Sequence, residues 1–232
     1  MTGAPHVAVI HFPGSLDHES AAAAARQSGS LGEAGHPVLS STIVDHKERG
    51  LPPGTCAVIL PGGFSYGDHL RCGAIASRAP IMAAVTRFAA EGGRVLGICN
   101  GFQMLCEAGL LPGVLRPNDS MSFICRQVTL EVDDAQTGWT GELAPGAKLS
   151  IPIKNHDGAW YGDPSDGRVV LRYSGENPTG AVDAIAGIAN HDGNVLGMMP
   201  HPECACDPLV GSADGRVVFQ SIIAAALVAE VA

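Results

Sequence analysis

The chain has 232 residues, of which 46% are hydrophobic and 16% charged, and its formal net charge at pH 7 is −9. This composition supports a large core and argues against wholesale disorder. The acidic balance, without any basic run, argues against nucleic acid or an anionic membrane as the main partner. The N-terminus lacks an export signal and no apolar run is long enough for a bilayer, so we expect a soluble, cytoplasmic protein. The seven cysteines, with no CxxC pair, are expected to be free thiols.

The first half of the chain alternates short β-branched runs with helical segments. We expect strands over residues 6–12, 38–44, 56–60 and 94–98. We expect helices over residues 19–27, over 71–93 with an interruption near Pro80, and from Cys99 to about Gly109. This alternation favours a parallel, doubly wound sheet.

The second half has a different rhythm, with strands separated by turns. We expect these strands over residues 123–132, 167–174, 183–190 and 194–200, before a last helix over roughly 214–230. The fold class predicted is therefore α/β, with a doubly wound, mostly parallel central sheet, flanking helices and a small antiparallel extension. No interdomain linker is evident, so residues 1–232 are expected to form a single domain.

The stretch GICNG, residues 97–101, has the form of a nucleophile elbow. Glycines on both sides of Cys99 let a strand turn sharply into a helix and expose the thiol above the sheet. The helix N-terminus then stabilises a thiolate and offers N–H groups to an oxyanion. By itself this pattern fits a buried structural cysteine equally well.

A catalytic thiol needs a base, and the stretch GMMPHPE supplies a candidate. His201 follows a predicted strand, and Glu203 lies two residues further on. A carboxylate that accepts a hydrogen bond from imidazole fixes its tautomer and orientation. Because parallel strands bring their carboxyl ends to one edge, Cys99, His201 and Glu203 form a candidate triad. Simple surface polarity is the competing interpretation for a histidine in a loop.

The stretch PGGFSYGD, residues 61–68, is a glycine-rich loop that follows another predicted strand. Such a loop can direct a backbone N–H at an oxyanion, although a tight turn or a weak anion nest has the same pattern. Neither GxxxxGK[ST] nor GxGxxG occurs, so the chain lacks a nucleotide-phosphate fingerprint.

Together these motifs resemble those of class I, triad-type glutamine amidotransferases and, more narrowly, the glutaminase subunits of phosphoribosylformylglycinamidine synthase. The resemblance covers nearly the whole chain in consistent order, and GGFSYGD with GICNGFQ is its most specific part. The stretches that carry it are FPGS (12–15), LPGGFSYGDHLRCGAIA (60–76), VLGICNGFQMLCEAGLLPG (95–113), FICR (123–126), GENPTG (175–180), GNVLGMMPHPE (193–203) and GSADGRVVFQSI (211–222).

The resemblance implies a flavodoxin-like fold and a role for each matching residue. Cys99 would attack the side-chain amide of L-glutamine, His201 would act as base and then as acid, and Glu203 would orient His201. The N–H groups of Gly63 and Asn100 would form the oxyanion hole. The residues expected to contact the rest of the substrate are Gln103, Gly62 and Phe123.

The resemblance also implies partners. Ammonia would pass to a separate large synthetase subunit, which uses ATP and Mg²⁺ to convert formylglycinamide ribonucleotide into its amidine, in a complex completed by a small auxiliary subunit. No cofactor is expected in this chain, in agreement with the missing phosphate motif. We also expect the isolated chain to hydrolyse glutamine poorly, because completion of the site on partner binding would prevent wasteful ammonia release.

Two departures from the family pattern stand out. Where members carry a His-Gly-Glu-Gly-like loop, this chain has NHDG, with Asn155 or His156 near the family histidine and Asp157 near its acidic residue. This loop is a candidate contact with the synthetase. The second departure is HPECACDP, in which Cys204 and Cys206 follow the triad. Their spacing is too tight for common zinc pairs, so no metal is expected.

Other interpretations remain open at this point. Proteins of the DJ-1 and intracellular-peptidase superfamily also carry a cysteine elbow, but they place histidine directly after the nucleophile, where this chain has Asn100. A paralogue that feeds another synthetase, or a non-catalytic assembly subunit, would share most of the motifs. Cys72 and Cys106, in predicted helical segments, are expected to be core residues.

Overall fold

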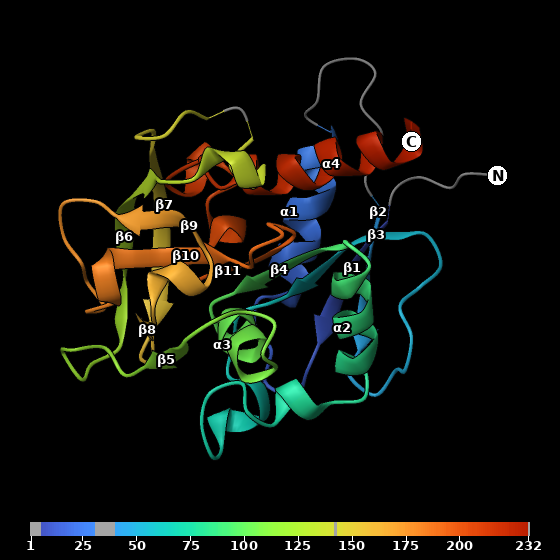
Figure 1. The fold of residues 1–232 in the computed structure, drawn as a ribbon, viewed down its shortest axis with the longest axis horizontal. Coiled ribbons are helices and arrows are strands. Elements are labelled where there is room, and N and C mark those ends of the chain that lie inside the picture. The colour runs from blue at the N-terminus through green and yellow to red at the C-terminus, as the bar shows by residue number, and fades with distance from the viewer. Residues whose placement is uncertain (1–5, 31–39, 142, 232) are drawn as a thin grey trace.

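The computed structural model describes residues 6–30, 40–141 and 143–231. These residues form one nine-stranded sheet with helices on both faces, and a separate two-stranded ribbon (Figure 1). The strand order is β2-β1-β3-β4-β11-β10-β9-β6-β7. The strands of the parallel block are β1 (His6–His11), β2 (Ser40–Asp45), β3 (Thr55–Leu60), β4 (Arg94–Ile98) and β11 (Val195–Met198).

The parallel block is buried because helices cover both of its faces. In β1, the four residues from Val7 to Ile10 are fully buried, as expected for a strand with apolar side chains on both faces. Helices α1 (His18–Ser30) and α4 (Arg216–Val231) pack together, while α2 (Met82–Ala90) and α3 (Asn100–Glu107) contact β4 (Figure 1). The predicted doubly wound arrangement is confirmed.

The antiparallel extension is four strands wide. It contains β10 (Ile185–Ala189), β9 (Arg168–Tyr173), β6 (Ile124–Val132) and β7 (Lys148–Asn155), and β5 (Val114–Arg116) pairs with β8 (Ala159–Tyr161) outside the main sheet. The sequence did not predict β5, β7 or β8. Pro152 interrupts the β7 pattern, yet β7 lies at the sheet edge, where a missing N–H costs no ladder hydrogen bond.

The predicted helix over residues 71–93 was wrong in its first part. Residues 71–81 form turns and a short 3-10 helix, η2 (Ala76–Arg78), and only α2 is α-helical. Gly73 has φ +77°, and a Cβ there would lie 2.7 Å from the backbone nitrogen of Met104. The chain therefore approaches α3 too closely for a helix. Pro80 further disfavours helical geometry at the residue before it.

The other predicted elements agree with the structure to within a few residues, except that positions 38 and 39 lie outside the described residues. None of the helices in the described ranges is long and apolar enough to cross a membrane.

Candidate active site

Cys99 lies at the strained turn between β4 and α3. Its backbone has φ 50° and ψ −104°, a conformation that residues other than glycine rarely adopt. A Cβ on Gly101 would lie 2.0 Å from the Leu60 carbonyl oxygen, and one on Gly97 would lie 2.7 Å from the Gly101 carbonyl oxygen. Both glycines therefore permit the close approach of strand and helix that the predicted elbow requires.

His201 and Glu203 come from the segment after β11, which runs parallel to β4. Nδ1 of His201 lies 2.6 Å from Oε1 of Glu203, and both residues are buried. No hydrogen-bond partner for Nε2 of His201 occurs within the described residues. The thiol of Cys99 donates to the carbonyl oxygen of Lys154 at 3.7 Å. Cys99 and His201 line the same pocket and Glu203 is bonded to His201, so the three candidate triad residues come together at the carboxyl edge of the sheet.

The charges around His201 favour its protonated form. Burial lowers the pKa of the imidazole, but the charges of Glu203 and Cys99 outweigh burial and raise this pKa from 6.5 to about 10. The protonated form of His201, next to the candidate nucleophile, is therefore favoured. This arrangement provides a proton for a leaving group.

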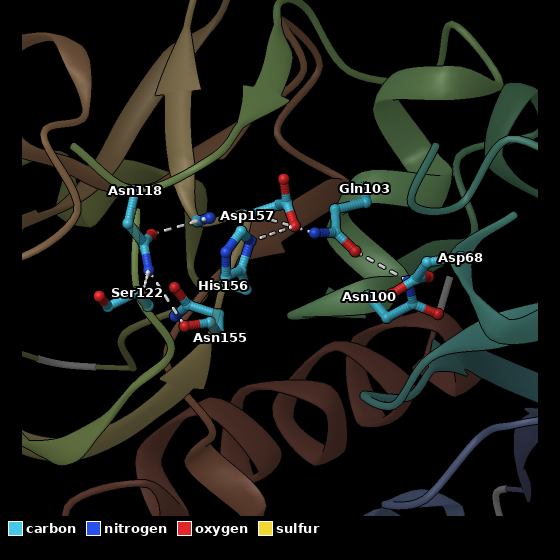
Figure 2. Close-up of polar contacts among 9 residues, drawn as sticks. Asp68, Asn100, Gln103, Asn118, Ser122, Asn155, His156 and Asp157 are labelled. Carbon is cyan, nitrogen blue, oxygen red and sulfur yellow. Dashed lines mark hydrogen bonds and ion pairs between the residues drawn. The ribbon is translucent and has the colours of Figure 1, made fainter. Parts of the chain in front are cut away.

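Asn100 links the elbow to the glycine-rich loop (Figure 2). Its side-chain oxygen accepts from the Ser65 N–H at 3.0 Å, and its Nδ2 donates to Asp68 at 3.2 Å and to Oε1 of Gln103 at 2.8 Å. The side chain of Asn100 thereby fixes loop 61–68 over the start of α3. This contact explains how the loop is held near Cys99.

Gln103 lies one turn along α3 and connects it to the NHDG loop. Its Nε2 donates to the carbonyl oxygen of Asp157 at 2.7 Å, and Asp157 also contacts the His156 ring at 3.0 Å (Figure 2). Asn118 supports the same loop through hydrogen bonds to Asn155 and Gly158 (Figure 2). The loop that departs from the family pattern is therefore part of the candidate site itself.

The candidate oxyanion and substrate residues occupy different positions in the site. Gly63, Gln103 and Phe123 line a pocket of about 200 Å³ that also contains Cys99. Gly62 lies behind it, where a Cβ would be 2.7 Å from Cε1 of His201. That Gly62 contacts the substrate thus stays a prediction, whereas the structure shows that Gly62 packs against the His201 imidazole.

Several pocket residues were not identified from the sequence. The most informative are Asp17 and Lys154, whose side chains pair at 2.5 Å beside His201. Neither belongs to a motif with a recognisable spacing, and only the meeting of residues 137 positions apart reveals them. The pocket-lining set is Leu16, Asp17, Gly63, Phe64, Asp68, Cys72, Cys99, Gln103, Phe123, Cys125, Lys154, Asn155, His156, Asp157 and His201.

Cys72 corrects another expectation. It lies in a turn and lines the pocket, because the predicted helix around it does not form. Burial, together with the charges of Asp68 and Asp157, raises the pKa of its thiol, so Cys72 is not a competing nucleophile at neutral pH. Cys106, in α3, is partly buried and packs against the core as expected.

One cluster of side chains near His201 consists of residue types that commonly bind metal ions. Asp17, His201, Glu203 and Cys204 place one ligand atom each within 4.8 Å of one another. However, the Lys154 ammonium already pairs with Asp17, and His201 and Glu203 are bonded to each other. A metal here would displace those contacts and occupy the triad, so the expectation of no metal stays a prediction.

Known proteins resemble this chain in sequence and in fold. The model of the CobB/CobQ-like glutamine amidotransferase domain matches residues 4–216. The phosphoribosylformylglycinamidine synthase subunit PurQ of Rubrobacter xylanophilus is 47% identical over 229 residues, covering 96% of this chain and 99% of that protein. The chain belongs to the PurQ family of glutamine amidotransferases.

Other members of the PurQ family give the same result. The subunit from Nocardia farcinica is 47% identical over 225 residues and covers 94% of this chain and 96% of its own length. A solved structure described as PurLQS from Thermotoga maritima contains a chain with a TM-score of 0.87 and 39% identity, covering 96% of this chain and 99% of that chain. These coverages show that the chain spans nearly the full length of its PurQ relatives.

Proposed function

We propose that this chain is the glutaminase subunit of a phosphoribosylformylglycinamidine synthase and hydrolyses L-glutamine to glutamate and ammonia. The observation that carries the proposal is the meeting of three features in one pocket. These are a strained elbow cysteine, a buried imidazole paired with Glu203, and a glycine loop held over the elbow by Asn100. Membership of the PurQ family supports the choice of glutamine as substrate.

In the first half-reaction, the Cys99 thiolate attacks the amide carbon of glutamine and forms a tetrahedral oxyanion. The N–H groups of Gly63 and Asn100 are the proposed donors to that oxygen. His201 gives its proton to the leaving nitrogen, the C–N bond breaks, and ammonia and a glutamyl thioester result. Among the described residues, no group competes for Nε2 of His201, so it is free for this transfer.

In the second half-reaction, neutral His201 takes a proton from water, and the resulting hydroxide attacks the thioester carbon. The C–S bond breaks, glutamate leaves, and the thiolate–imidazolium pair is restored. Glu203 keeps the imidazole oriented through both steps by its bond to Nδ1. Gln103 and Phe123, which line the pocket, are the proposed contacts with the remainder of glutamine, together with Gly62.

The proposal extends to the partners. The Thermotoga maritima relative comes from a structure described as PurLQS, and we infer that this chain likewise assembles with a large synthetase subunit and a small auxiliary subunit. ATP and Mg²⁺ would serve the synthetase subunit, with no cofactor in this chain.

We also propose a cytoplasmic location. Within the described residues, the nine-stranded sheet and the hydrophobic core that surrounds it support a single domain, which we propose for residues 1–232.

Reconstitution tests the proposal. The chain is mixed with the synthetase and auxiliary subunits of the same organism, and glutamate formation is measured with formylglycinamide ribonucleotide, ATP and Mg²⁺. We expect glutamine-dependent amidine formation and weak glutaminase activity of the isolated chain. A glutamine-like diazoketone should label Cys99 in the complex. Absence of both activity and label would favour a non-catalytic assembly subunit, and activity only with another synthetase would favour a paralogue.

A further inference from the structure

Asp17 and Lys154 lie beside the triad without belonging to it. Oδ2 of Asp17 is 3.6 Å from Nδ1 of His201, and Oδ1 of Asp17 is 2.5 Å from Nζ of Lys154. The Asp17 side chain is 10% exposed and the Lys154 side chain 34%. The three residues therefore form a short row of charges that begins at the catalytic imidazole and ends in the pocket.

The backbone holds Asp17 firmly in place. Its N–H donates to the carbonyl oxygen of Gly62 at 3.2 Å, and its own carbonyl accepts from Ala21 at 2.9 Å at the start of α1. A Cβ on Gly62 would lie 2.6 Å from Oδ2 of Asp17 and 2.7 Å from Cε1 of His201. The carboxylate and the imidazole thus share a space that only glycine leaves open.

Lys154 connects this carboxylate to the nucleophile. Its carbonyl oxygen accepts from the thiol of Cys99, while its ammonium pairs with Asp17. Burial lowers the pKa of Lys154, but the bond to Asp17 and its charge outweigh burial and raise the pKa overall. The ammonium is therefore charged at neutral pH and offsets part of the charge of Asp17.

We propose that Asp17 and Lys154 form a positioning pair for the triad histidine, in which Asp17 provides a second carboxylate near Nδ1 and Lys154 fixes and partly neutralises it. A catalytic acid–base works best when its proton affinity matches the reaction. Glu203 together with an unpaired Asp17 would hold the proton on His201 too tightly for transfer to ammonia. The positive charge of Lys154 offsets part of the Asp17 charge and so weakens the hold on this proton. The proposal rests on the proposed function.

The groups that face His201 come from four parts of the fold. They are Cys99 at the elbow, Glu203 and Cys204 after β11, Asp17 before α1, and Lys154 on β7, which acts through its ion pair with Asp17. Burial, followed by the charge of Glu203, raises the pKa of Cys204 to about 12, so this thiol is neutral over the working range. A change of charge at Asp17 or Lys154 should therefore change the pH at which the His201 imidazole is half protonated.

The test is a titration of His201 by NMR in the full chain, with its signal assigned by comparison with His201→Gln. At the pH where His201 of the unaltered chain is half protonated, Asp17→Asn should lower the imidazolium fraction and Lys154→Met should raise it. Each change should correspond to a shift of about one pH unit. Lys154→Arg should retain the original midpoint, and the double variant should fall between the two single variants.

The matched control is the ion pair between Asp134 and Arg168, which is 2.7 Å long and does not line the pocket. Asp134→Asn should leave the His201 midpoint unchanged. Equal midpoints in all variants, or shifts in the same direction for Asp17→Asn and Lys154→Met, would overturn the proposal. If Asp17→Asn does not fold, the two Lys154 variants decide. A higher His201 titration midpoint in Lys154→Met, with an unchanged midpoint in Lys154→Arg, supports the proposal. Unchanged midpoints in both variants overturn it.

Glutaminase assays of the reconstituted complex give a second readout. Asp17→Asn should lower kcat about tenfold, a fraction of what general acid–base catalysis contributes, with a smaller change in KM. An inactive unaltered complex would contradict the proposed function, while the NMR midpoints would still decide the role of the pair. An active complex with unchanged midpoints would contradict the positioning pair alone.

Discussion

The two ring nitrogens of His201 have different environments. Nδ1 is bonded to Glu203 at 2.6 Å, whereas Nε2 has no partner within the described part of the chain. The protein therefore fixes one side of the imidazole and leaves the other for the proposed proton transfer. Replacing the carboxylate tests this division directly.

Glu203→Gln should reduce glutamine-dependent turnover by roughly 10² to 10⁴-fold, because an amide does not stabilise the imidazolium. The Glu203 charge raises the pKa of His201, so its loss should move the alkaline limb of the kcat–pH profile to lower pH. Glu176→Gln, which alters an exposed ion pair with Arg126, is the control and should leave the profile unchanged. An unshifted alkaline limb in Glu203→Gln would argue against its role.

Cys99→Ala should abolish glutamine-dependent amidine synthesis by the complex, with a loss on the order of 10⁴-fold or more. Synthesis from added ammonia should be spared, because the acceptor chemistry is proposed to lie in the synthetase subunit. The two rates are measured in parallel on the same preparation. Loss of both would mean that Cys99 is needed for assembly or folding, not for chemistry.

The His201 charge should also affect stability. Its folded-state pKa of about 10 lies above the ordinary value of 6.5, so the folded protein holds the proton more tightly than the unfolded chain. This contribution is complete below about pH 6.5 and is lost as pH rises through about 10. Urea unfolding under reducing conditions should show the stability difference between the unaltered chain and His201→Gln shrinking with rising pH. A gap that widens toward pH 10 would contradict this sign.

Gly101→Ala should destabilise the protein by on the order of 3 kcal/mol, because the added methyl would lie 2.0 Å from the Leu60 carbonyl oxygen. Gly50→Ala is the matched control, since no atom lies within 4 Å of the added methyl. Thermal unfolding of both variants measures the difference. Equal melting temperatures would mean that strand β3 and helix α3 separate more easily than their packing indicates.

Asn100→Ala should weaken substrate turnover while retaining the backbone N–H proposed for the oxyanion hole. The change removes the bonds to Ser65, Asp68 and Gln103 that fix the glycine loop. We expect kcat/KM for glutamine to fall about tenfold to a hundredfold, with Cys99 still reactive toward iodoacetamide in peptide-resolved mass spectrometry. Unchanged kcat/KM would show that the loop is held by other contacts.

The amino-acid sequence was sufficient to predict the parallel block and the triad geometry. Apolar runs bounded by turns predicted β1, β3 and β4, and the GICNG pattern predicted the elbow at Cys99. These features are local, because glycine spacing and hydrophobic periodicity act within a few residues. The same local logic failed for residues 71–81, where close packing of Gly73 against α3 outweighs helix propensity.

The wider composition of the site depended on tertiary structure. Asp17 and Lys154 are 137 residues apart in sequence, and β7, which carries Lys154, was hidden by Pro152 and its edge position. Local sequence thus determined which residue is the candidate nucleophile and which histidine is its candidate base. Only tertiary structure decided which further charges surround that histidine, because the pairing of β7 with β6 and the contact of the segment before α1 with Gly62 follow from sheet order and not from local pattern.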